Sequence, residues 1–232
     1  MEKSWRRLAV KDKKFSLVGI NKLPAIVRAI IQASRYRSKP LYQSSILYGK
    51  NTNPNQGLYY MGNAQANIDL ALWTQNLRFS IKKINLKFDS LEKELAQLER
   101  EIIEAYRTST PEEQTRYNAI NAALKLAQEL NERSWFEGAT LKYLDVVSAF
   151  GLLKNPQVNS NEIPAMKAKL AEKLAALNKS NFDQSIGITY LEIAQGILAN
   201  EGVSETDLKR AKVILDTVLP KYENKFLNKG SK

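Results

Sequence analysis

The sequence DSLEKELAQLEREIIEAYRTSTPEE at residues 89–113 encodes two helices and the turn between them. In its first part, apolar residues recur every three or four positions from Leu91 to Tyr106, which is the spacing of one face of an α-helix. Asp89 and Glu92 stand three residues apart in front of this run, in the pattern of a capping box. The stretch therefore predicts a helix that begins at Asp89.

The second helix has a stronger start signal. Thr110 can accept a hydrogen bond from a backbone amide of the first turn, Pro111 suits the first helical position, and Glu113 can bond back to the Thr110 amide. Because the turn is very short, we expect residues 89–108 and 111–133 to form an antiparallel helical hairpin.

Helical spacing extends outward on both sides of this hairpin. An apolar stripe runs from Leu23 to Ile31 and ends before Ser34, and other helices are predicted at residues 58–77, 135–153, 165–177, 182–199 and 205–226. Turn residues predict a loop at 39–57 and a linker at 155–161, and the short strand candidates are 15–20 and 81–88. We find no regular repeat period along the chain. The predicted fold is all-α, with about eight helices in stacked antiparallel hairpins.

Composition and turn signals suggest the following organisation. We expect a basic arm at residues 1–20, a helical body at 21–154, a helical subdomain packed on the body at 155–228, and a tail at 229–232.

The chain has no histidine and no cysteine, which excludes several kinds of site. Ser-His-Asp and Cys-His catalysis, thiolate zinc sites and disulfides cannot be built without these residues. Phosphate-binding glycine loops of the common types are also missing. We therefore expect no cofactor and no metal. An enzyme would have to use Asp, Glu, Lys, Tyr or Ser, with Asp69 and Asp145 as the carboxylates to test.

Charge is distributed very unevenly. Of the formal net charge of +11, the first 50 residues carry +10, from twelve Lys and Arg against two acidic residues. A concentrated field of one sign attracts partners of the other sign. The residues predicted to bind an anionic surface are Lys3, Arg6, Arg7, Lys11, Lys13, Lys14, Arg28, Arg35 and Arg37.

Three interpretations of this basic segment remain open. In the first, an amphipathic helix with Ile26, Ile30 and Ile31 on its apolar side lies on anionic lipid or meets an acidic protein. In the second, the cations neutralise nucleic-acid phosphates while nearby aromatic side chains stack on bases; these are Trp5, Phe15, Tyr36 and Tyr42. In the third, the apolar stripe packs into the core, and the cations face water or the net acidic residues 87–134.

Aromatic clusters supply the second group of candidates. Tyr59 and Tyr60, beside small residues, and Trp135 and Phe136, at a helix start, are predicted to line a groove for a partner. Core packing is the alternative that the pattern favours for the same residues, and Trp73 is predicted to be a core residue.

These patterns together predict a non-enzymatic helical interaction or scaffold protein whose basic amino-terminal arm docks on an anionic surface. A nucleic-acid-binding protein and a carboxylate-dependent enzyme are the alternatives. The longest apolar segment, Leu23–Ala33, is too short to cross a membrane and contains Arg28. No signal peptide is visible, and we expect a soluble chain with a protein partner.

Overall fold

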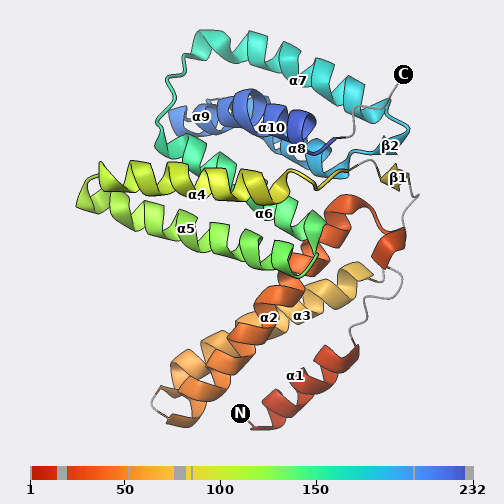
Figure 1. Cartoon of the computed structure of the whole chain (residues 1–232), viewed down its shortest axis with the longest axis vertical. Helices are drawn as coiled ribbons and strands as arrows, with labels where there is room; N and C mark the ends of the chain where they lie inside the picture. The colour runs from red at the N-terminus through yellow and green to blue at the C-terminus, as the bar shows by residue number, and fades with distance from the viewer. Residues whose placement is uncertain are drawn as a thin grey trace. The chain divides into compact units, whose positions relative to one another are not determined.

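A computed structural model describes residues 2–14, 20–51, 53–75, 82–84, 86–200 and 202–227. The chain forms two compact units, Met1–Ile81 and Lys82–Lys232, here called the N-terminal unit and the C-terminal unit. The predicted all-α fold of packed helical hairpins is confirmed (Figure 1). The sequence suggests boundaries after residues 20 and 154, whereas the division between the two units falls after Ile81.

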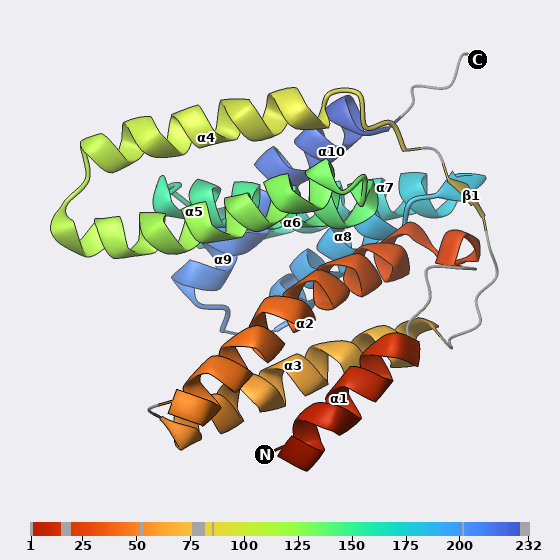
Figure 2. The same ribbon diagram turned by 60° about the horizontal axis from the view of Figure 1, so that its bottom comes forward.

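The N-terminal unit is built on one long hairpin. Its elements are α1 (Glu2–Lys14), the short 3-10 turn η1 (Ile20–Lys22), α2 (Ala25–Asn51) and α3 (Pro54–Gln75). Helices α2 and α3 pack against each other along their length, and α1 lies along α3 (Figure 2). Residues 2–14 of the predicted basic arm therefore form a helix that is packed on its own unit.

The predicted loop at 39–57 is wrong for most of its length. Helix α2 continues through Pro40 to Asn51, although proline removes a backbone donor in a helix interior. Packing along α3 compensates for this local cost. Helix α3 therefore begins only three residues after the end of α2. The Asn53 side chain accepts a hydrogen bond from the Gln56 amide and so caps the start of α3.

The C-terminal unit contains the remaining helices. They are α4 (Leu91–Arg107), α5 (Pro111–Glu132), α6 (Phe136–Leu153), η2 (Ser160–Glu162), α7 (Ile163–Asn178), α8 (Ser185–Ala199), α9 (Glu205–Val213), η3 (Ile214–Val218) and α10 (Leu219–Lys225). Two short strands, β1 (Lys83–Ile84) and β2 (Phe182–Asp183), pair in parallel. The strand candidate at 81–88 thus contains β1, and 15–19 of the other candidate lies outside the described residues.

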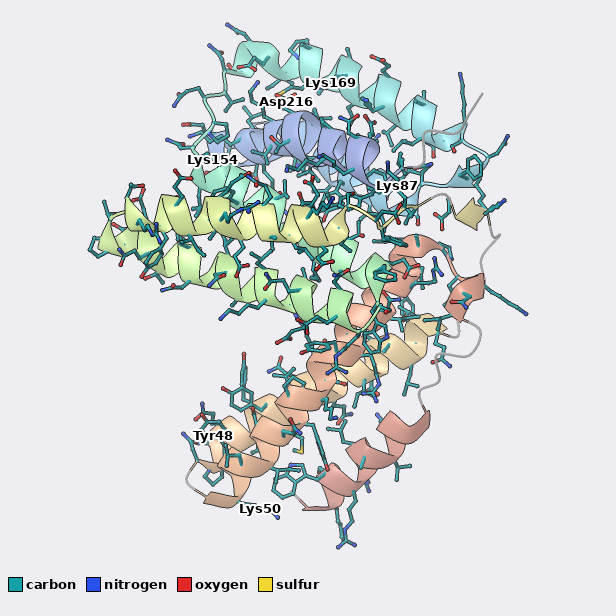
Figure 3. The ribbon with its side chains drawn as sticks, viewed as in Figure 1. Tyr48, Lys50, Lys87, Lys154, Lys169 and Asp216 are labelled. Carbon is teal, nitrogen blue, oxygen red and sulfur yellow. The ribbon has the colours of Figure 1, made fainter. Side chains whose placement is uncertain are left out.

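Most successive helices of this unit pack on each other, namely α4 with α5, α5 with α6, α7 with α8 and α8 with α9, and Figure 1 shows α4 and α5 as antiparallel neighbours. The π-helical turn η3 precedes Pro220, which has no backbone N–H to continue a regular ladder. Asp216 in this turn accepts a hydrogen bond from Lys169 of α7 at 2.6 Å (Figure 3). A long-range ion pair therefore fixes α7 to the last helical segment.

The two predicted capping boxes had different outcomes. At Thr110 both reciprocal bonds are present, so that prediction is confirmed. At the start of α4 the prediction is wrong by one residue, because the helix is preceded by Ser90, whose side chain makes no capping bond. The Ser90 hydroxyl instead donates to the carbonyl of Lys225 at 2.8 Å. A tertiary contact has taken the place of the local cap.

Replacing Thr110 with alanine should lower the free energy of unfolding by about 1 kcal/mol, because the Glu113 amide loses its acceptor. Urea unfolding followed by circular dichroism would measure this change. Thr115→Ala, at an exposed position inside the same helix, is the matched control and should cause no loss. Equal destabilisation by both substitutions would contradict a capping role.

Candidate functional site

The surplus of positive charge belongs to the N-terminal unit. Residues 1–81 contain thirteen Lys and Arg but only three acidic residues, so the unit carries +10 while the C-terminal unit carries +1. In the C-terminal unit, ion pairs within the unit match many cations, for example Lys173 with Glu223 at 2.6 Å. The N-terminal unit has too few carboxylates to neutralise itself in this way.

Helix α1 is held on the α2–α3 hairpin by its apolar side. The indole of Trp5 is buried and donates a hydrogen bond to Ser45 at 3.1 Å. Leu8 packs with Ala64 and Ile68 of α3. The opposite side of α1 faces outward, with Val10 56 % exposed. Helix α1 is thus amphipathic, and its apolar face is already buried within the unit.

The cations predicted to bind an anionic surface differ in accessibility. Lys3, Arg6, Arg7 and Arg37 are exposed, whereas Arg35 and Lys11 are partly buried and Arg28 is buried. Lys11 pairs with Asp69 at 2.9 Å. The side chains of Lys13 and Lys14 lie outside the described part of the structure.

The apolar stripe between Leu23 and Ile31 is a core element. Leu23, Val27 and Ile31 form a buried cluster with Ile20, and Ile26 packs against it. The interpretation in which this stripe lies on lipid therefore does not fit the fold, since its side chains are already packed.

Other apolar side chains of the N-terminal unit are exposed instead. Among the described residues, seven large apolar side chains are exposed, and only Ile103 of these belongs to the C-terminal unit; the other six are Val10, Leu47, Leu58, Tyr59, Leu70 and Trp73. The prediction that Trp73 is a core residue is wrong, because it is 63 % exposed. This concentration of exposed apolar side chains in the cationic unit was not predicted from the sequence.

Helix α3 presents an exposed row of apolar and small residues. Positions three and four apart share a face of a helix, and on this face all five residues are uncharged and exposed. They are Tyr59, Gly62, Ala66, Leu70 and Trp73, which we call the α3 ridge. The spacing of these positions could have identified the ridge, but only the structure distinguishes an exposed row from a buried one.

A groove runs between α2 and α3 beside the α3 ridge. Its volume is about 580 Å³, and its lining includes Tyr59, Tyr60 and Arg37. Tyr60 stacks on Tyr48 of α2, with their ring centroids 5.4 Å apart. Tyr59 and Tyr60 both line this groove together with Arg37, and the binding of a partner there stays a prediction.

The other predicted pair, Trp135 and Phe136, belongs to the C-terminal unit and is partly buried. Phe136 stacks on Phe88 with the ring centroids 5.2 Å apart. This contact joins the start of α6 to the segment before α4. The Phe136 side chain therefore has a packing role. The two predicted aromatic pairs thus lie in different units.

The aromatic residues proposed to stack on bases are mostly unsuited to that role in this fold. Trp5 is buried, and Tyr42 packs against the cluster that holds α1. Phe15 lies outside the described residues. Tyr36 lines the α2–α3 groove. No row of exposed aromatic side chains follows the cations of α1 in the described part of the unit.

Neither carboxylate chosen for a catalytic test lies alone. Asp69 is paired with Lys11, as described above. Asp145 accepts a hydrogen bond from Lys142 at 2.6 Å and another from the Tyr190 hydroxyl at 2.8 Å. Burial and the nearby Asp145 charge raise the pKa of the Tyr190 phenol well above its usual value. The bond between Asp145 and Tyr190 joins α6 to α8, so both of these side chains have a structural role.

A largely buried charge network of the C-terminal unit is centred on Glu94 of α4. Its carboxylate accepts hydrogen bonds from Tyr143 at 2.9 Å, from Lys225 at 2.6 Å and from Lys221 at 3.3 Å. Burial raises the pKa of Glu94, but these three partners outweigh it and leave the pKa below its usual value. The network connects α4, α6 and α10.

The described residues contain no group of three or more acidic side chains placed to hold a metal ion. Within the same residues, no helix combines the length and apolar character needed to cross a membrane. Comparison with known proteins finds no family model, no curated protein and no solved structure that matches the chain.

Proposed function

We propose that this protein is a non-enzymatic helical interaction protein whose N-terminal unit attaches it to an anionic surface. One observation carries the proposal. The unit that holds nearly all of the net charge also holds six of the seven exposed large apolar side chains among the described residues. Cations supply long-range attraction, and exposed apolar groups supply short-range burial once contact is made.

The outward side of α1 is the part of the unit best suited to the electrostatic role. Lys3, Arg6 and Arg7 are exposed on it. Because α1 is fixed by Trp5 and Leu8, these cations are held on a folded surface. The C-terminal unit, with its paired charges, then remains available to carry a protein partner.

The test uses charge removal without removal of the helix, since deleting α1 would expose the core around Leu8. Lys3→Gln combined with Arg7→Gln should weaken binding to anionic surfaces about thirtyfold, at about 1 kcal/mol for each cation. Binding is measured by sedimentation with phosphatidylserine-containing vesicles and by retention on polyglutamate resin, each at several salt concentrations.

Lys93→Gln combined with Lys125→Gln removes the same charge from exposed positions of the C-terminal unit and serves as the matched control. This control should bind like the wild type. If the wild-type protein binds neither material, or if both double variants lose the same affinity, the N-terminal unit is not an attachment surface.

A further inference from the structure

The α3 ridge is a long, exposed and uncharged strip on one side of a helix. From Tyr59 to Trp73 it is about 21 Å long at 1.5 Å per residue. Tyr59 and Trp73 stand at its two ends and are 68 % and 63 % exposed. A Cβ atom added at Gly62 would meet nothing within 4 Å, so the middle of the ridge is open.

Cations and polar groups border the α3 ridge on both sides. Asn63 and Asn67 lie on one flank of α3, where they line the α2–α3 groove together with Arg37. Asp69 lies on the other flank, where it binds Lys11 of α1. The ridge is therefore an apolar strip between two polar margins, one with the positive charge of Arg37 and the other with the Lys11–Asp69 ion pair.

Three occupants could cover such a strip, and charge and shape distinguish them. A second copy of this chain would bring together two units of +10 each, which repel. An acidic amphipathic helix lays its apolar face in a groove, but the groove of this unit lies between α2 and α3, and Leu70 and Trp73 of the ridge do not line it. An anionic bilayer accepts an exposed apolar strip, attracts a unit that carries +10 and favours Trp and Tyr at its interface.

We infer that the α3 ridge is the face that inserts into the interfacial layer of an anionic lipid bilayer, with α3 lying in the membrane plane. This inference rests on the proposed function and specifies its surface as lipid. Leu70 and Trp73 enter the boundary between headgroups and acyl chains. Arg37 contacts lipid phosphates at one margin of the strip, and the Lys11–Asp69 ion pair lies at the other margin.

The experiment compares the full chain with ridge variants. Leu70→Gln combined with Trp73→Gln should lower partitioning into vesicles of phosphatidylserine and phosphatidylcholine by about tenfold or more, since two apolar side chains no longer leave water. The same variant should keep its affinity for polyglutamate resin, because its charge is unchanged. Ile103→Gln, a substitution at a similarly exposed apolar position of the C-terminal unit, is the control and should partition like the wild type.

Tryptophan fluorescence supplies a second measurement, which reports insertion in the wild-type protein and does not depend on a change in affinity. The emission of the wild-type protein should shift to the blue on anionic vesicles and be quenched by brominated lipid. Trp73→Phe should lose both changes, since Trp5 is buried in the fold and the partly buried Trp135 belongs to the C-terminal unit, which does not insert.

The outcomes separate the two proposals. Vesicle binding that persists in the ridge variant without a Trp73-dependent shift would overturn insertion while leaving charge-driven attachment in place. Retention on polyglutamate without any vesicle binding would also overturn insertion and would favour an acidic protein as the surface. If the variant with Lys3→Gln and Arg7→Gln bound anionic surfaces as tightly as the wild type, the proposed function itself would be contradicted.

Discussion

Replacing Glu94 with alanine is expected to lower the free energy of unfolding by about 3 kcal/mol. The substitution removes the shared acceptor of Tyr143, Lys221 and Lys225. The Tyr143 side chain is fully buried, so its hydroxyl would lose a partner that water cannot easily replace. The two lysines would face each other without the carboxylate between them. Chemical denaturation of the full chain measures the change.

Glu92→Ala is the matched control, because Glu92 is exposed on the same turn of α4. It should change the free energy of unfolding by no more than about 0.5 kcal/mol. Similar losses at both positions would show that the network around Glu94 contributes little.

The pH dependence of stability gives an independent check on this network. The folded state lowers the pKa of Glu94, so its carboxylate stabilises the fold at pH values above the unfolded pKa of about 4.3. This contribution is lost as the pH falls through the still lower pKa of the folded state. Glu94→Gln should therefore show a smaller loss of stability than the wild type between about pH 5 and pH 3. If the free energies of unfolding of the wild type and of Glu94→Gln fell equally with pH, the stabilising role of the Glu94 carboxylate would be contradicted.

Replacing Gly57 with valine is expected to destabilise the N-terminal unit by about 3 kcal/mol. A Cβ atom at Gly57 would lie 2.6 Å from the Cα atom and 2.7 Å from the nitrogen of Gly49. Both are backbone atoms of α2, so no side-chain rotation can relieve the clash, and the two helices must separate. Hydrogen exchange of amides in α2 and α3 would detect the loss of protection.

Gly62→Val tests the same substitution on the same helix where space is available. It should leave the stability of the unit within about 0.5 kcal/mol of the wild type. If Gly57→Val also had no effect, the close approach of α2 and α3 would not be a requirement of the fold.

Local sequence signals predicted the helices of the C-terminal unit well. The Thr110 capping box and the helix over 111–133 are confirmed as α5, and residues 135–153 are confirmed as α6 with a shift of one residue. Ser204 caps α9 in the same local way, since its hydroxyl accepts a hydrogen bond from the Asp207 amide. These features depend on residues within one turn of each other, so neighbouring side chains determine them.

Features that depend on distant residues were predicted poorly. Pro40 suggested a loop, but α2 continues through it because α3 packs along that helix. Trp5 and Trp73 are the same residue type, yet Trp5 is 8 % exposed and Trp73 is 63 % exposed. No local pattern distinguishes them, since burial depends on which helix packs against each position.

The sequence alone determined the all-α class, the helix starts and the concentration of charge, because propensity, capping and net charge are properties of neighbouring or summed residues. Only the tertiary structure decided which surface the N-terminal unit presents. It buried the stripe between Leu23 and Ile31, fixed α1 by Leu8, and left the α3 ridge uncovered. The physical reason is that an apolar helix face is a core or a contact surface according to what packs on it, and that partner lies far away in the chain.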